Sequence, residues 1–120
     1  MSAEFTFPKK VRLLTASDYS KVFQDVQLRV SSKNFLILAR TCEKNHPRLG
    51  IIIAKKNVKL AVERNRLKRQ LRETYRKQRQ VLPSLDIVVL AKKGADSYNS
   101  SLIAKELDYL WQKLKHKASK

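Results

Sequence analysis

Residues 63–79 read ERNRLKRQLRETYRKQR, and this basic stretch decides how the chain is organised. Eight of its seventeen residues are Lys or Arg, and only Glu63 and Glu73 oppose them. The stretch contains neither Gly nor Pro. Apolar residues fall at steps of seven, four and four along one helical face, at Leu60, Leu67, Leu71 and Tyr75. The pattern predicts a helix over about residues 58–80 whose apolar stripe packs on a protein core.

The cations of this helix lie beside and opposite the apolar stripe. One row has a spacing of four, at Arg64, Lys68, Arg72 and Arg76, and the charge is extended by Arg66, Arg69, Lys77 and Arg79. The planar guanidinium of arginine suits phosphate oxygens, with which it can form two parallel hydrogen bonds. A solvated helix face is the simpler interpretation, but such a face usually mixes signs so that residues four apart can pair. The pattern therefore indicates a surface that binds a polyanion.

The composition of the whole chain supports a nucleic-acid partner. A formal net charge of +17 and a pI near 10.4 are typical of such proteins. Disorder is disfavoured, because the hydrophobic residues fall in periodic segments. A single cysteine, Cys42, excludes an internal disulfide and favours a reducing compartment. We expect one cytoplasmic domain over residues 1–120, with an arm at 1–10, a frayed basic tail at 116–120, and no signal peptide, membrane span or membrane partner.

The remaining segments predict an α+β fold. Thr15 is typical of a helix N-cap and Asp18 of a first turn, and the short helix that they begin runs to about Asp25. Apolar runs predict strands, at residues 28–30, 35–39, 49–54 and 86–91. A last helix begins at about Ser100 and turns five apolar residues inward, Ile103, Leu107, Leu110, Trp111 and Leu114. The order is that of a small split βαβ sandwich with about four strands and three helices.

Residues that could carry nuclease chemistry are scarce. The chain has ten Asp and Glu residues and two His residues, and no set of three has the spacing of a metal site. Asp18 and Asp25 could share a helix face, but they have no third partner. Cys42 lacks a histidine in the pattern of a thiol nucleophile, and His46 beside Pro47 is typical of a turn. We predict no catalytic residue and no metal site in the chain.

Residues 48–56, RLGIIIAKK, and residues 61–73, AVERNRLKRQLRE, resemble the bacterial ribonuclease P protein subunit. The family's RNR motif stands at residues 64–66, after a strand that ends in Lys-Lys. Many members carry a glycine before the motif, where this chain has NVKL at residues 57–60. The family's first helix and last strand have similar sequences here, at residues 12–23 and 86–94. The resemblance therefore covers nearly the whole chain.

The resemblance implies a compact α+β protein that joins a large catalytic RNA, and no obligate protein partner. In the family this complex cuts the 5′ leader from precursor tRNA, with Mg²⁺ held mainly by the RNA. The basic helix faces the catalytic RNA, and the matching residues here are Arg64, Asn65, Arg66, Lys68, Arg69, Arg72 and Arg76. A cleft between the first helix and the sheet holds the leader, and the matching residues are Tyr19, Phe23, Leu36, Leu38, Ile52, Ala54, Lys55 and Lys56.

The residues of this cleft suit single-stranded RNA, which binds through base stacking and phosphate attraction. Strand parity places Leu36 and Leu38 on one face of their strand, where they could form an aliphatic floor. Tyr19 and Phe23 lie four residues apart and would form one wall. The alternative, that both aromatic residues belong to the core, stays open.

Two other functions also stay open. A ribosomal-type or RNA-chaperone protein would bind many structured RNAs and would ignore a 5′ leader. A DNA-binding protein would lay the basic helix in a major groove. The apolar stripe and the absence of a dimerising heptad after the helix weigh against this last function.

Overall fold

The computed structural model describes residues 15–42, 46–78 and 80–119, so the predicted arm at residues 1–10 lies outside it. The elements are α1 (Ala16–Gln24), β1 (Leu28–Ser31), β2 (Phe35–Thr41), β3 (Arg48–Ile52), α2 (Ala61–Gln78), β4 (Leu85–Ala91), the 3-10 helix η3 (Ala95–Ser97) and α3 (Ser100–Ala118). The predicted order of helices and strands is confirmed. Helix α3 includes the first three residues of the segment that was expected to fray.

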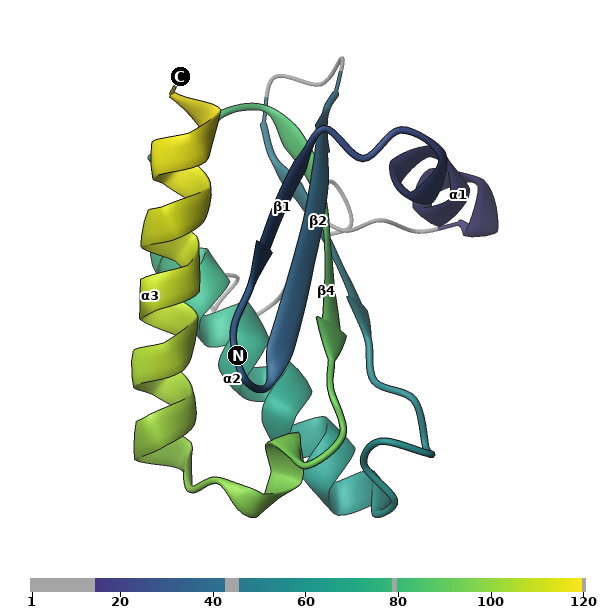
Figure 1. Ribbon diagram of the computed structural model, residues 1–120, viewed down its shortest axis with the longest axis vertical. Coiled ribbons are helices and arrows are strands. Elements are labelled where there is room, and N and C mark those ends of the chain that lie inside the picture. Colours follow the sequence, from purple (N-terminus) through teal and green to yellow (C-terminus); the bar gives the residue numbers. More distant parts are fainter. Residues whose placement is uncertain (1–14, 43–45, 79, 120) are drawn as a thin grey trace, which may run out of the picture.

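The four strands form one sheet in the order β1-β2-β4-β3. β2 is antiparallel to β1 and β4, while β3 and β4 are parallel and are connected through α2. Helices α2 and α3 cover one face of the sheet, and α1 lies on the other (Figure 1). The sheet is thus the middle layer, and its two faces have different neighbours.

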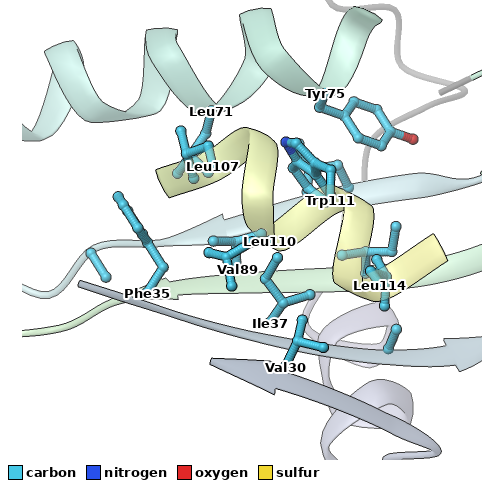
Figure 2. Close-up of a cluster of buried hydrophobic side chains, with 14 of the residues drawn as sticks. Val30, Phe35, Ile37, Leu71, Tyr75, Val89, Leu107, Leu110, Trp111 and Leu114 are labelled. Atoms are coloured by element: carbon cyan, nitrogen blue, oxygen red, sulfur yellow. The ribbon is translucent and has the colours of Figure 1, made fainter. Parts of the chain in front are cut away.

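The main core lies between the sheet and the α2–α3 pair (Figure 2). All five residues predicted to face inward from α3 are buried. The indole Nε1 of Trp111 donates a hydrogen bond to Thr74 Oγ1 at 2.9 Å, and its ring centroid lies 5.7 Å from that of Tyr75. The basic helix is therefore anchored through one face and presents the other to solvent.

The start of α2 corrects the sequence interpretation. The helix begins at Ala61 rather than at about residue 58, and Leu60 is 62 % exposed instead of lying in the apolar stripe. A turn sends Val58 into the core, because the backbone N–H of Val58 donates to the carbonyl of Ala54 at 3.0 Å. Val58 thus takes the buried place that was predicted for Leu60. The rest of the stripe is buried as predicted, at Leu67, Leu71 and Tyr75.

The connection before α2 works without the glycine of many relatives. Among the described residues, no amino acid other than glycine has a positive φ, so this turn needs no left-handed conformation. The side chain of Asn57 donates from Nδ2 to the carbonyl of Ala91 at 3.0 Å. Asn57 therefore fastens the turn to the end of β4.

Candidate nucleic-acid interface

The register of the sheet places three cross-strand rows of side chains on the face that α1 covers. The rows are Arg40-Asp86-Arg48, Leu38-Val88-Gly50 and Leu36-Leu90-Ile52. Val22 of α1 is fully buried in one cluster with Leu38 and Val88, so α1 sits over the middle row. The residues of the third row are only half-buried. An aliphatic strip therefore remains open beside α1.

The two aromatic residues of α1 differ in their exposure. Phe23 is 44 % exposed, which excludes it from the core. Tyr19 is half-buried and packs beside the small cluster around Val22. A capping box fixes the helix that carries them: Asp18 N–H donates to Thr15 Oγ1 at 3.1 Å, and Thr15 N–H donates to Asp18 Oδ2 at 3.2 Å. The predicted N-cap is confirmed, and one aromatic ring is available to a ligand.

The strip combines predicted residues with one that was missed. Strand parity correctly placed Leu36 and Leu38 on one face of β2, and Ile52, which the resemblance grouped with them, lies on the same face of the sheet, toward α1. Leu90 lies between Leu36 and Ile52, and the alternation of residues along β4 could have identified it. Beyond β3, Ala54 is partly exposed, and Lys55 and Lys56 are exposed. The strip thus ends in two cations.

The solvent side of α2 carries most of the predicted cationic residues. Asn65, Arg69, Arg72 and Arg76 are exposed, and Lys68 is partly exposed. Arg76 Nη2 donates to Glu73 Oε1 at 2.6 Å, and this hydrogen bond lowers the pKa of Glu73. Within the described part of the chain, the side chains of Asn65, Lys68 and Arg69 have no hydrogen-bond or ion-pair partner. These three groups are available to a ligand.

The structure separates Arg66 from this solvent-facing set. Its Nε and Nη2 donate to Glu63 at 3.0 and 2.8 Å. Nη2 also lies 3.4 and 3.3 Å from the carbonyl oxygens of Asp96 and Tyr98, and Nη1 lies 3.3 Å from Ser100 Oγ. All three guanidinium nitrogens are therefore engaged, and Arg66 ties α2 to the chain that enters α3.

Arg64, the first residue of the RNR motif, also contacts the protein. Its Nη1 donates to the carbonyl oxygens of Val58 and Lys59 at 3.0 and 2.8 Å. No other contact of its guanidinium is seen in the described ranges, so Nη2 and Nε can still donate. Within the motif, Asn65 is therefore exposed, Arg64 is hydrogen-bonded to the protein through one nitrogen, and Arg66 is hydrogen-bonded through all three.

The charged row Arg40-Asp86-Arg48 crosses the sheet beside α1. Arg48 donates to Asp86 through Nε at 2.8 Å and Nη2 at 2.9 Å, and its Nη2 lies 3.7 Å from Asp18 Oδ1. The hydrogen bond to Asp86 raises the pKa of Arg48. A cavity of about 460 Å³ lies here, lined by Asp18, Lys21, Arg40, Thr41, Cys42, Arg48 and Asp86. The row holds α1 on the sheet.

Sequence comparisons relate this chain to known proteins. The sequence model of the ribonuclease P family matches residues 7–115. The ribonuclease P protein component of Marinobacter nauticus is 52 % identical over 112 residues, which are 93 % of this chain and 84 % of the relative. That of Pseudomonas aeruginosa strain PAO1 is 45 % identical over 108 residues, covering 90 % and 80 %.

Solved structures show the same fold. The ribonuclease P protein of Staphylococcus aureus superimposes with a TM-score of 0.79 at 26 % identity, covering 85 % of this chain and 93 % of the other. The protein from Thermotoga maritima gives a TM-score of 0.69 at 29 % identity, covering 84 % and 96 %. Among the described helices, none is long and apolar enough to cross a membrane. Since the family model spans most of its length and close relatives carry the same name, the chain belongs to the ribonuclease P protein family.

Proposed function

We propose that this protein binds the RNA subunit of ribonuclease P through α2 and holds the 5′ leader of precursor tRNA along the aliphatic strip of Leu36, Leu90 and Ile52 beside α1, which we call the leader groove. The complex then removes the leader by endonucleolytic cleavage. One observation carries the proposal: the sheet face that α1 covers keeps an open aliphatic strip, α1 carries the exposed ring of Phe23, and the exposed Lys55 and Lys56 follow the strip's last strand. Single-stranded RNA needs such stacking surfaces with positive rims.

The exposed side of α2 supports the role proposed for the RNA subunit. A cation that has no partner inside the protein can neutralise a phosphate without leaving another protein group unpaired. Lys68 and Arg69 have no such partner within the described ranges. Asn65 can add hydrogen bonds of defined direction, because an amide both donates and accepts. Arg72 and Arg76 extend the same exposed surface, and Arg64 can contribute through its remaining donors.

We assign Mg²⁺ to the RNA subunit rather than to this chain. Across the described residues, no three His, Cys, Asp or Glu side chains come together as a metal site would require. Two carboxylates on the α1 side of the sheet, Asp18 and Asp86, both pair with Arg48. The protein's own contribution is to bind and orient RNA. The proposal also places it in the cytoplasm, which its single cysteine supports.

The first prediction concerns cleavage. Purified, RNA-free protein incubated with precursor tRNA and Mg²⁺ is expected to release no leader, because no three His, Cys, Asp or Glu side chains of the described residues come together to hold a metal ion that would activate water. Addition of ribonuclease P RNA should start cleavage at the 5′ end of the mature tRNA. Gel analysis of labelled precursor before and after this addition measures both steps. Cleavage before the addition would contradict the proposed division of labour.

The second prediction concerns the groove. Phe23→Ala removes a stacking surface worth about 1–3 kcal/mol per base, so precursor with a long leader should bind the reconstituted enzyme about tenfold more weakly. Mature tRNA lacks a leader, and its affinity should stay the same. Binding curves for both RNAs, with a melting curve for the protein, measure this difference.

A matched control is Tyr109→Ala on α3, because Tyr109 is also an exposed aromatic residue, at 55 %, but lies on a helix of the opposite sheet face. This variant should bind both RNAs normally. A ribosomal-type or chaperone protein would show no preference for the leader in any variant. Equal losses for precursor and mature tRNA in folded Phe23→Ala would remove Phe23 from the leader site.

A further inference from the structure

Gly50 lies in the cross-strand row of Leu38 and Val88, on the face that α1 covers. A Cβ atom at position 50 would lie 2.6 Å from Cε1, 2.8 Å from Cζ and 2.8 Å from the hydroxyl oxygen of Tyr19. Carbon atoms that are not bonded normally stay about 3.5–4.0 Å apart. The end of the tyrosine ring therefore fills the volume in which any other residue would place its side chain.

The backbone itself gives no reason for glycine at this position. Gly50 lies inside β3 and pairs in regular register with Val88, and among the described residues only Gly94 has a positive φ. A glycine inside a strand is unfavourable, since it loses more conformational freedom on folding and packs no side chain. What position 50 requires is the close approach of Tyr19.

We infer that Gly50 is a positioning residue for leader binding: it seats the Tyr19 ring against β3 and thereby fixes one wall of the groove. The ring lies beside Val22 and Leu38, next to the open row that ends at Ile52. This inference rests on the proposed function, because it concerns the groove assigned to the leader. Gly50 itself offers no side chain to RNA and acts only through the ring above it.

A methyl group at position 50 would displace this ring rather than the strand. The colliding atoms belong to the far end of a side chain that rotates about two bonds, whereas β3 is hydrogen-bonded to β4. Restoring an ordinary contact from 2.6 Å requires the ring to move by about 1 Å. A shift of this size is enough to disturb stacking on a positioned base.

The test uses the protein reconstituted with ribonuclease P RNA. Gly50→Ala should weaken binding of long-leader precursor tRNA about three- to tenfold and leave mature tRNA unaffected. In the Tyr19→Ala background, Gly50→Ala should have no further effect on the precursor-to-mature affinity ratio, because the group with which it collides is absent. A purely structural role would not change this ratio in a folded enzyme.

Gly94→Ala is the matched control, since Gly94 is the other of the two glycines in the chain. Its φ is +94°, and a Cβ there would meet no atom within 4 Å. The substitution should lower the melting temperature through backbone strain and leave the affinity ratio unchanged. The control therefore separates the effect of replacing a glycine from the effect of displacing the Tyr19 ring.

The outcomes distinguish the two proposals. An unchanged ratio in both Tyr19→Ala and Phe23→Ala would overturn the leader groove itself. A lowered ratio in Tyr19→Ala with an unchanged ratio in Gly50→Ala would overturn only the positioning role, as would a Gly50→Ala effect that persists without Tyr19. If Gly50→Ala unfolds below the assay temperature, the double variant Tyr19→Ala/Gly50→Ala is expected to be folded, because it lacks the ring with which the new methyl group collides. A double variant that stays unfolded also overturns the positioning role.

Discussion

Raising the salt concentration from about 50 to about 200 mM should weaken binding of this protein to ribonuclease P RNA about 100- to 500-fold. Each neutralised phosphate releases condensed counterions, so the logarithm of affinity falls with the logarithm of salt by about 0.7–0.9 per phosphate. The exposed side of α2 offers cations for about five phosphates, which gives a slope of roughly −3.5 to −4.5. Filter binding or fluorescence titration over this salt range measures the slope.

Single substitutions locate the surface that produces this slope. Arg69→Ala should flatten it by about one unit, because Arg69 is exposed and has no internal partner in the described ranges. Lys105→Ala, an exposed cation on α3, is the matched control and should leave the slope unchanged. Arg66→Ala should act mainly on the melting curve, since it leaves Glu63 and two backbone carbonyls without their donor. Equal slopes for Arg69→Ala and the unmodified protein would place the RNA interface elsewhere.

Periodicity predicted the parts of the fold that depend on neighbours in sequence. The faces of β2 and the inward side of α3 follow from spacings of two and of three to four residues. Leu38 packs in the cluster on the α1 side while Ile37 packs in the main core, and Leu107 and Trp111 of α3 are buried, which confirms them. The capping box of α1 is equally local, because Thr15 and Asp18 are three residues apart. Such features need no knowledge of the rest of the chain.

Contacts between distant segments could not be predicted in this way. Arg66 and Arg69 are both cations of the basic stretch, and each has a glutamate within four residues. Beyond its local pair with Glu63, Arg66 is held by groups about thirty residues later, among them the carbonyls of Asp96 and Tyr98, and the sequence does not show these contacts. The start of α2 was predicted too early, because the turn at Ala54 decides which apolar residue enters the core. The exposure of Phe23 and the close approach of the Tyr19 ring to Gly50 likewise depend on how α1 packs on the sheet.

The pairing of Arg48 with Asp86 is also long-range, and Asp86→Ala should lower the free energy of unfolding by about 3–5 kcal/mol. The side chains are only 15 % and 6 % exposed, so the substitution leaves the Arg48 charge mostly buried beside the cavity, with Asp18 as its remaining ion-pair partner at 3.7 Å. Urea unfolding followed by circular dichroism measures the loss. Because Arg48 also holds α1 through Asp18, leader binding should weaken in the same variant.

Asp25→Ala supplies the control at the same end of the sheet. Its partner Arg40 lies 3.8 Å away, and the side chains of Arg40 and Asp25 are 29 % and 54 % exposed. Solvent therefore screens the pair, and Asp25→Ala should lower the free energy of unfolding by less than about 1 kcal/mol. The double variant Arg48→Met/Asp86→Ala should regain part of the stability lost in Asp86→Ala, because it removes the stranded charge. Equal losses in Asp25→Ala and Asp86→Ala, or a double variant less stable than Asp86→Ala, would show that the buried pair does not anchor α1 in the way the geometry indicates.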